Sequence, residues 1–366
     1  MKTLQLERLS VRALRNLQRV DLEPAPRVNV ITGNNGQGKT SLLEAIYFAA
    51  TSRSFRTSKL TELVAHGEDT ASARARFAEH GGELTALTRE QAAVLSGRRC
   101  AVTIDGNRPS SLADFATRSP VVAFHPEEML LSIGPAPARR TLLDRLALFV
   151  SPLSADHRAR YAHALRARQQ LLQGSGGPDL DAFEELCARH GAAVTRARRE
   201  AAEDLARELL PAFARIGAPG LALEARYTPG GSADEEEMRA ELRQRRRPDS
   251  FRKSAGFGPH RDDLVLELDG HPARTVASQG QHRALTLALK AAETACVARV
   301  RGVEPILLLD DVSSELDPDR TLALFLFLGL TRGQIFLTTT RTDLIVTPGV
   351  EAADRRDFEL RAGALA

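Results

Sequence analysis

One short stretch constrains this chain more than any other: the glycine-rich segment GNNGQGKTS at residues 33–41. It follows the apolar run VNVIT and matches the pattern G-x-x-x-x-G-K-[ST]. In such a segment a strand ends in a turn whose backbone N–H groups point inward and form a nest for phosphate oxygens, and the following helix adds its positive end. The segment therefore predicts a nucleotide phosphate site between a strand and an amphipathic helix.

Each residue type in this loop has a physical reason to be there. Glycine allows positive φ and a close approach of the backbone to phosphate. Lys39 is expected to reach the β and γ phosphates and to act in catalysis, and Thr40 to offer its hydroxyl to Mg²⁺. The chain has only five lysines, so a lysine at this place by chance is rare. The residues expected to contact the nucleotide here are Gly33, Asn34, Asn35, Gly36, Gln37, Gly38, Lys39, Thr40 and Ser41.

A second acidic element lies far along the chain, in PILLLDDVSSELD at residues 305–317. Its apolar run has the form of a buried strand that delivers Asp310 to Mg²⁺ at its C-terminal end. Asp311 follows directly, where a carboxylate could polarise an attacking water. Taken alone, two aspartates after a strand are better explained as a helix cap. Together with the glycine-rich loop, they favour a Mg²⁺–nucleotide site.

A third element, SQGQ, opens a helical stretch about twenty residues before the acidic strand. Such a serine is usually only a helix cap, but its position resembles the signature of ABC-type ATPases. The resemblance implies that ATP is held between two subunits, with the signature of one facing the nucleotide of the other. It also implies that Ser313–Asp317 crosses the same interface. The signature residues are Ser278, Gln279, Gly280 and Gln281.

The order of the elements predicts an α/β protein, an ABC-type P-loop ATPase head split by a mostly helical insertion. Strand-like runs dominate residues 1–125, a helical pattern begins at residue 126 and extends to about residue 217, and alternating strands and helices return near residue 256. We therefore expect ATPase parts at 1–125 and 251–366 and a helical lobe at 126–250. Lys39 and Asp310 are 271 positions apart, more than in transporter ATPases.

Composition limits the setting of this protein. No run approaches eighteen apolar residues and the N-terminus lacks a signal-like apolar stretch, so we expect no membrane segment and a cytoplasmic protein. Three widely spaced cysteines fit a reducing compartment. The net charge is only +3, so any DNA-binding surface must come from local clusters of arginine.

Several longer segments together resemble the RecF family of bacterial recombination mediators, a relative of SMC heads. They include LRNLQRVDLEP, the glycine-rich loop with SRSFRT, FHPEEMLLSIGPAPARRTLLDR, GPHRDDL, SQGQHRAL and LLLDDVSSELD. The resemblance implies ATP-dependent dimerisation, binding of duplex DNA near single-strand gaps, and loading of RecA with the partners RecO and RecR. It implies slow hydrolysis, because Asp311 replaces a longer glutamate and Thr338–Thr340 replace a phosphate-sensing histidine. The alternatives are a transporter ATPase subunit or a small SMC-like structural ATPase.

The resemblance also suggests residues outside the main motifs. Arg12 and Asn16 stand where related heads contact adenine and phosphates, although an ordinary surface role is equally compatible. Glu127 or Glu128 takes the place of a usual glutamine. His260, Asp262 and Asp263 could bind a metal, but salt bridges or caps explain them better. The DNA-binding candidates, each otherwise a solvated charge, are Arg53, Arg56, Arg139, Arg140 and the run Arg245–Arg247.

Overall fold

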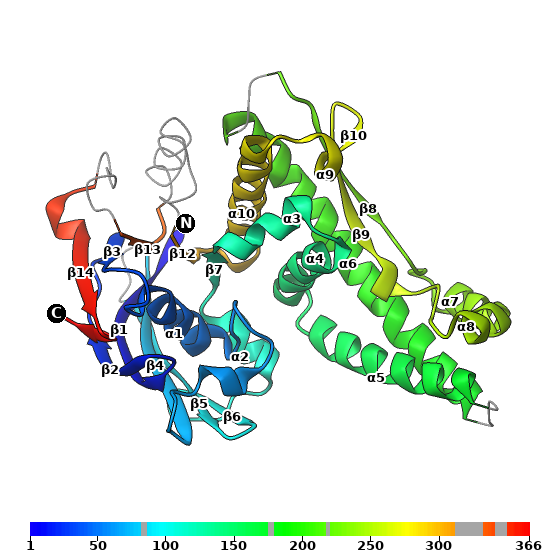
Figure 1. Ribbon diagram of the computed structural model, residues 1–366, viewed down its shortest axis with the longest axis horizontal. Coiled ribbons are helices and arrows are strands. Elements are labelled where there is room, and N and C mark those ends of the chain that lie inside the picture. The colour runs from blue at the N-terminus through cyan, green and yellow to red at the C-terminus, as the bar shows by residue number, and fades with distance from the viewer. Residues whose placement is uncertain (82–85, 175–178, 217–219, 312–331, 341–349) are drawn as a thin grey trace. The chain divides into compact units, whose positions relative to one another are not determined.

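The computed structural model describes residues 1–81, 86–174, 179–216, 220–311, 332–340 and 350–366. Its contacts form two compact units: unit 1 contains Met1–Glu128 and Glu293–Ala366, and unit 2 contains Met129–Ala292 (Figure 1). The chain thus leaves unit 1 and returns to it, as a split head requires. The return occurs later than the sequence boundary at 250, because residues 251–292 supply strands and a helical segment that belong to unit 2.

The central sheet of unit 1 has six described strands in the order β15-β14-β3-β13-β12-β7. Except for the antiparallel pair β14 and β15, its neighbours run parallel. The residues of β12 and β13 are all buried, which is the reason these strands read as near-continuous apolar runs. The strands are β3 (Val28–Thr32), β7 (Val121–Phe124), β12 (Ile306–Leu309), β13 (Ile335–Thr339), β14 (Arg355–Arg361) and β15 (Ala364–Leu365).

A second sheet in unit 1 has the order β11-β1-β4-β5-β6, with β2 paired to β1. In β1 the buried positions shift from Leu4 and Leu6 to Leu9 and Val11, so the buried face changes from even to odd numbers. A bulge between Leu6 and Arg8 in the pairing with β4 accounts for this shift. The strands are β1 (Lys2–Leu14), β2 (Leu17–Leu22), β4 (Thr70–His80), β5 (Leu87–Ser96), β6 (Arg99–Ile104) and β11 (Val303–Glu304).

Helix α1 (Lys39–Thr51) contacts strands of both sheets, including β4, β5 and β13. The sequence analysis expected an amphipathic helix, and this expectation was wrong, since eleven of its residues are buried. A helix covered from both sides must be apolar around most of its circumference. This burial fixes the start of α1, and with it the end of the glycine-rich loop. The short helix α2 (Leu112–Arg118) also packs against α1.

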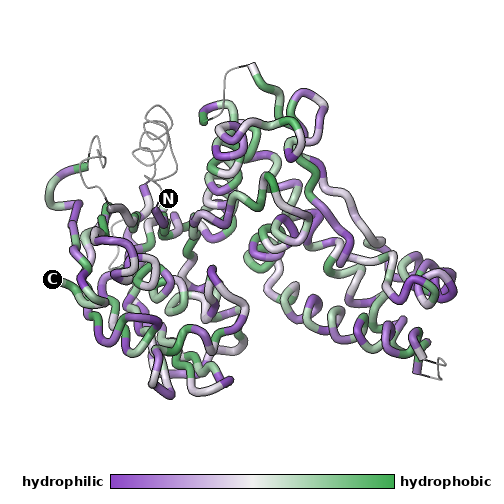
Figure 2. The backbone as a smooth tube through the Cα atoms, in the orientation of Figure 1, coloured by the Kyte–Doolittle hydropathy of each residue, from purple (hydrophilic) through white to green (hydrophobic). Residues whose placement is uncertain are grey.

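Unit 2 is mostly helical and carries a three-stranded sheet in the order β10-β9-β8. Its longest helix, α6, has 37 residues and packs against α4, α5 and α7. Hydrophilic and hydrophobic residues alternate along these helices in Figure 2, as expected when one face packs inward. The elements are α3 (Leu130–Ile133), α4 (Ala136–Val150), α5 (Ser154–Gln173), α6 (Leu180–Ile216), β8 (Leu223–Thr228), α7 (Glu235–Gln244), α8 (Arg246–Arg252), β9 (Asp263–Leu268), β10 (His271–Pro272), α9 (Ala273–Val276) and α10 (Gln279–Arg301), which continues into unit 1.

The expected strands and helices correspond to these elements throughout the described ranges. The sequence also predicts a helix after Pro318, but that stretch and the segment Ser313–Asp317 lie outside the described residues. Among the described helices, none combines the length and the apolar character needed to cross a membrane.

Candidate nucleotide-binding site

The glycine-rich loop connects the end of β3 to the start of α1 and is tightly packed at two of its glycines. Gly33 has φ 146°, and a Cβ there would lie 2.4 Å from the carbonyl oxygen of Leu360. Gly38 has φ 108°, and a Cβ there would lie 2.9 Å from the side chain of Leu17. Both positions therefore require glycine for backbone conformation and for space.

Two neighbouring turns of unit 1 hold the loop in place. The Asn16 side-chain amide, in the β1–β2 turn, donates to the Gly36 carbonyl at 3.0 Å. The Gly363 backbone N–H, in the β14–β15 turn, donates to the Gln37 carbonyl at 3.0 Å. Asn16 therefore contacts the loop itself, and its proximity to bound phosphates stays a prediction.

Lys39 is the first residue of α1 and is only 8% exposed. Its ammonium group donates to the carbonyl oxygens of Gly33 at 2.6 Å and Asn34 at 3.0 Å. Burial lowers the pKa of Lys39, and the nearby carboxylates of Asp311 and Asp310 oppose that shift. The cation is thus held across the mouth of the loop, where it can exchange carbonyl partners for phosphate oxygens.

Thr40 and Asp310 meet at one point, although they come from opposite ends of the chain. The Thr40 hydroxyl lies 2.9 Å from each carboxylate oxygen of Asp310. The Thr338 hydroxyl donates to Asp310 Oδ1 at 2.8 Å. Burial raises the pKa of Asp310, and the two hydroxyl donors oppose the shift. Because β3, β12 and β13 are parallel, their carboxyl ends bring these three residues to one edge of the sheet.

This cluster fits Mg²⁺. A hydroxyl and a carboxylate are hard oxygen donors of the kind that Mg²⁺ takes from proteins, usually one or two per ion alongside phosphate oxygens. The carboxylate of Asp310 is buried and accepts hydrogen bonds from two neutral hydroxyl groups, so a divalent ion would compensate its charge. Thr40 and Asp310 are therefore the residues that would hold the metal.

Asp311 occupies a strained position beside this cluster. Its φ is 50°, in the left-handed region that non-glycine residues seldom adopt. Its backbone N–H donates to the Thr338 hydroxyl at 2.8 Å, which fixes the turn after β12. The residue lines the same pocket as Lys39 and Thr40, as a group that orients a water would have to do.

A buried carboxylate that was not predicted from the sequence holds two arginines that line the pocket. Glu44, in α1, is fully buried and accepts a bidentate pair of hydrogen bonds from Arg15 at 2.9 and 3.0 Å. It also accepts from Arg56 at 3.4 Å and from the Ser54 hydroxyl. An acidic residue inside the apolar stretch SLLEAIYF was the available signal, since a buried charge must be paired.

These groups surround an open pocket of about 480 Å³ in unit 1. Arg15 lines it, whereas Arg12 does not: the Arg12 guanidinium pairs with Asp21 at 3.1 Å and is 41% exposed. The structure thus brings together most of the expected loop residues and adds Arg15, Arg56 and Thr338. The lining residues are Arg15, Asn16, Asn35, Gly36, Gly38, Lys39, Thr40, Ser41, Arg56, Asp310, Asp311 and Thr338.

The signature segment lies in unit 2 at the exposed start of α10. The Ser278 hydroxyl accepts from the Gln281 backbone N–H at 3.2 Å, and the Gln281 side chain accepts from the Ser278 N–H at 2.7 Å. This is a capping box, so Ser278 acts as the helix cap that the sequence allows, and its role as an ATPase signature stays a prediction. Ser278 and Gln279 are exposed, and Gly280 and Gln281 are partly exposed. The segment is therefore open to a second molecule.

The GPHRDDL segment has a structural role within unit 2. The Asp262 carboxylate is fully buried and accepts from Arg198 at 3.0 Å, Tyr227 at 2.7 Å and the Gly230 N–H at 2.8 Å. The Nδ1 atom of His260 forms a hydrogen bond of 2.8 Å with the Tyr161 hydroxyl. Across the described residues, no group of three His, Cys, Asp or Glu side chains is arranged for a metal. Hydrogen bonds and ion pairs account for this motif.

Two of the DNA-binding candidates take part in the same network. Arg139 is 6% exposed and makes a bidentate pair with Asp263 at 2.7 and 2.9 Å. Arg140 donates to the Asp262 carbonyl at 2.8 Å. Their charges are engaged inside unit 2, which gives both arginines a structural explanation. Glu128 pairs with His125 at 3.4 Å and lies outside the pocket lining, as does the exposed Glu127.

Comparisons with known proteins agree with this geometry. Residues 5–350 match the family described as the RecF/RecN/SMC N terminal domain. The DNA replication and repair protein RecF of Anaeromyxobacter sp. (strain Fw109-5) is 43% identical over 93% of this chain and 94% of that protein. RecF of Myxococcus xanthus (strain DK1622) is 37% identical over 99% of this chain and 97% of that protein.

Solved structures give the same assignment. The recombination mediator protein RecF–ATP in the RecFOR pathway has a TM-score of 0.86 and 27% identity, covering 100% of this chain and 97% of that one. The Smc head domain of Pyrococcus furiosus, with a TM-score of 0.55 and 15% identity over 100% of this chain and 95% of that one, shares only the fold. RecF relatives that cover the chain almost completely favour the recombination reading over a transporter subunit. This chain belongs to the RecF family of DNA replication and repair proteins, with the ABC-type ATPase head that RecF shares with SMC proteins.

Proposed function

We propose that this protein is an ATP-dependent DNA-binding protein of recombinational repair that uses the pocket of unit 1 as its nucleotide site. The observation that carries the proposal is the convergence of Lys39, Thr40 and Asp310 on one pocket of about 480 Å³. Lys39 binds the phosphates, and Thr40 with Asp310 holds Mg²⁺. The metal supplies charge neutralisation at the phosphates when it is bound.

Hydrolysis in this proposal depends on Asp311 and is slow. Asp311 orients a water toward the terminal phosphate, and its short side chain holds that water less firmly than a glutamate would. Arg15 and Arg56 add positive charge to the pocket, both tethered to Glu44. Tethered cations stabilise developing negative charge without reorganising at the moment of reaction.

ATP also joins two copies of the chain. The pocket is lined by residues of unit 1, and the exposed signature at Ser278 belongs to unit 2. In the proposed dimer the Ser278 hydroxyl and the start of α10 face the nucleotide bound by the other copy, where a helix N-terminus favours phosphate. The dimer binds duplex DNA near single-strand gaps in the cytoplasm. Of the candidates Arg53 and Arg56, Arg56 is paired with Glu44, which leaves Arg53 to contact DNA. RecO and RecR are its partners in loading RecA.

The deciding experiment is fluorescence anisotropy with duplex DNA at several salt concentrations, in ATP, ADP or no nucleotide. ATP should raise DNA affinity, because dimerisation presents two arginine-bearing surfaces to one duplex. The logarithm of affinity should fall with the logarithm of salt concentration by about 0.9 per phosphate contact. Equal affinity in all three nucleotide states would reject an ATP-controlled DNA-binding dimer.

A further inference from the structure

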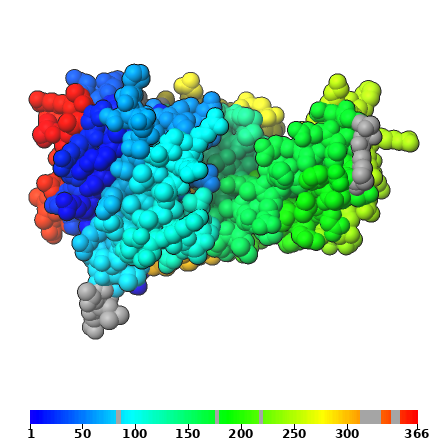
Figure 3. All heavy atoms as spheres, turned by 90° about the horizontal axis from the view of Figure 1, so that it is seen from below, coloured from blue at the N-terminus to red at the C-terminus, as the bar shows by residue number. Residues whose placement is uncertain are grey.

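The helices α7 and α8 lie at one end of unit 2 (Figures 1 and 3), and the segment from Arg243 to Ser254, which contains α8, is basic and has no role in the nucleotide site. Between Arg243 and Ser254 the chain has six basic residues and one acidic residue. Figure 2 shows this end as predominantly hydrophilic. At its centre is Phe251, whose side chain is 90% exposed.

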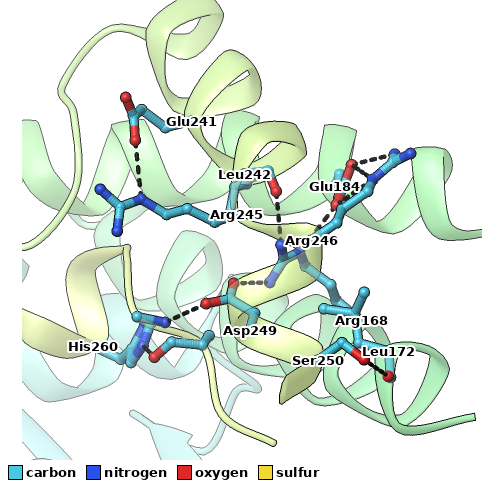
Figure 4. Close-up of polar contacts among 12 residues, drawn as sticks. Arg168, Leu172, Glu184, Glu241, Leu242, Arg245, Arg246, Asp249, Ser250 and His260 are labelled. Carbon is cyan, nitrogen blue, oxygen red and sulfur yellow. Dashed lines mark hydrogen bonds and ion pairs between the residues drawn. The ribbon is translucent and has the colours of Figure 1, made fainter. Parts of the chain in front are cut away.

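The basic residues of this segment divide into two groups. In the first group, whose members are paired, Arg243 lies 3.8 Å from Asp181. Arg245 pairs with Glu241 at 2.9 Å and lies over the Phe257 ring, while Arg246 forms an ion pair with Glu184 (Figure 4). These arginines serve the fold. Arg247, Arg252 and Lys253 are exposed, and within the described residues none of them has an acidic side chain within ion-pair distance. Their charge remains available to a ligand.

A buried network holds α8 so that the second group points outward. Arg168, fully buried in α5, donates to Asp249 of α8 at 2.7 Å (Figure 4). The Ser250 hydroxyl donates to the Leu172 carbonyl at 2.8 Å. Arg246, Asp249 and Ser250 are spaced i, i+3, i+4 and share the inward face, so Arg247 and Phe251, themselves four residues apart, share another face. These hydrogen bonds anchor α8 to α5, while the side chains of Arg247 and Phe251 face water.

We propose that Phe251, with Arg247, Arg252 and Lys253, forms a binding site for single-stranded nucleic acid. An aromatic ring in water offers a stacking surface to any unpaired base, and neighbouring cations neutralise the phosphates on either side. A duplex keeps its base faces covered, so it cannot use the ring in this way. The inference deepens the proposed function, on which it rests, by assigning the single-stranded part of a gapped substrate to a specific surface.

Charge decides between nucleic acid and a protein as the occupant. A protein partner would have to provide carboxylates for three cations and an apolar pocket for the ring. A polyanion with exposed aromatic bases meets both needs along one strand. The excess of basic residues in the segment is the electrostatic pattern expected of such a surface.

The test uses the full chain and a fluorescein-labelled single strand of twenty thymidines, with a duplex of equal length beside it. Phe251→Ala should lower single-strand affinity about tenfold, as expected for one stacked base, and Phe251→Tyr should retain it. A triple variant, Arg247→Gln with Arg252→Gln and Lys253→Gln, should bind the single strand with a weaker salt dependence. The slope of log affinity against log salt concentration should decrease by about 2, since each phosphate contact contributes about 0.7. Leu153→Ala, which truncates another exposed apolar residue of unit 2, is the matched control and should change neither affinity.

A direct reporter is available because the chain contains no tryptophan. Phe251→Trp would introduce the only one, and stacking should quench its fluorescence with the thymidine strand but not with the duplex. Unchanged single-strand affinity in Phe251→Ala, or an equal loss for both DNA forms, would overturn the stacking site while leaving ATP-controlled duplex binding intact. Failure of the wild-type protein to bind either DNA form would instead refute the proposed function.

Discussion

The Thr40 hydroxyl lies 2.9 Å from both carboxylate oxygens of Asp310, although the two residues are separated by 270 positions in the chain. Thr40 is the second residue of α1, which follows β3, and Asp310 comes directly after β12. The strand β13 lies between β3 and β12 in the sheet, and its Thr338 joins the pair. This contact is the physical basis for treating two distant motifs as one site.

Lys39→Met should weaken ATP binding at least about a hundredfold, because it removes the buried cation that faces the phosphates. The variant also loses the bonds to the Gly33 and Asn34 carbonyls, so its melting temperature must be measured alongside a fluorescent-nucleotide titration. Lys59→Met, at an exposed lysine outside the pocket, is the control. An unchanged affinity in a folded Lys39→Met protein would remove the phosphate-loop assignment.

Asp310→Asn should raise the melting temperature of the nucleotide-free protein near neutral pH while weakening nucleotide binding in Mg²⁺ about tenfold or more. The raised pKa of Asp310 means that its ionised form lowers the stability of the folded protein. This loss of stability applies above the folded pKa and disappears at lower pH, and the neutral amide of asparagine removes it. Affinity measured in EDTA should differ little from wild type. Asp311→Asn is the contrasting variant: it should keep Mg²⁺-dependent binding and slow hydrolysis. Equal losses of binding in both variants would argue against separate roles.

Glu44→Gln should destabilise unit 1 by about 2–3 kcal/mol, because breaking a buried ion pair leaves the partner charges uncompensated. The figure is below that of a fully buried pair, since the Arg15 and Arg56 side chains are 20% and 42% exposed. Nucleotide affinity should fall as well, because both arginines line the pocket. Chemical denaturation and nucleotide titration measure the two effects. Glu62→Gln, at an exposed glutamate, should show neither effect, and a Glu44→Gln protein as stable as wild type would contradict a stabilising role for the pairing of Glu44 with Arg15 and Arg56.

Ser278→Arg should leave ATP binding intact and prevent ATP-dependent dimerisation, because a long cation replaces the hydroxyl at the exposed start of α10. Ser278→Ala is the control, because it also removes the helix cap but adds no cation. Loss of the cap should lower stability by about 1 kcal/mol. Mixing Ser278→Arg with Lys39→Met should restore one productive site of two. Sedimentation is the measurement, and an ATP-bound Ser278→Arg dimer as tight as wild type would exclude the sandwiched arrangement.

Mild acid should destabilise unit 2 through the pair His157 and His190, whose Nδ1 atoms lie 2.9 Å apart. Burial, reinforced by His157, lowers the pKa of His190, so its contribution to stability is present above the ordinary value of 6.5 and is lost as pH falls below it. A proton on His190 creates a charge that burial disfavours, so the folded state loses stability when this ring is protonated. His190→Gln should flatten the dependence of the melting temperature on pH below pH 6.5. His163→Gln, at an exposed histidine of α5, should follow wild type; identical slopes in all three proteins would refute the effect.

The sequence by itself determined the local parts of this protein. The spacing from Gly33 to Thr40 specified a phosphate loop, because its glycines and lysine have narrow conformational and chemical reasons to be there. The apolar runs of β3, β12 and β13 predicted strands. These runs are nearly continuous because both faces of the sheet are covered. The change from strand to helical pattern near residue 126 likewise marked the split of the head.

Only the tertiary structure decided which distant side chains share a site. Arg12 and Arg15 are only three positions apart, yet they have different partners. Arg12 lies in β1 and pairs with Asp21 of β2, whereas Arg15 lies in the turn after β1, pairs with Glu44 and lines the pocket. The burial of Arg139 by Asp263 likewise depends on partners 124 positions away. The sequence does not reveal whether an arginine side chain faces water or a buried carboxylate, because that depends on packing between elements far apart in the chain.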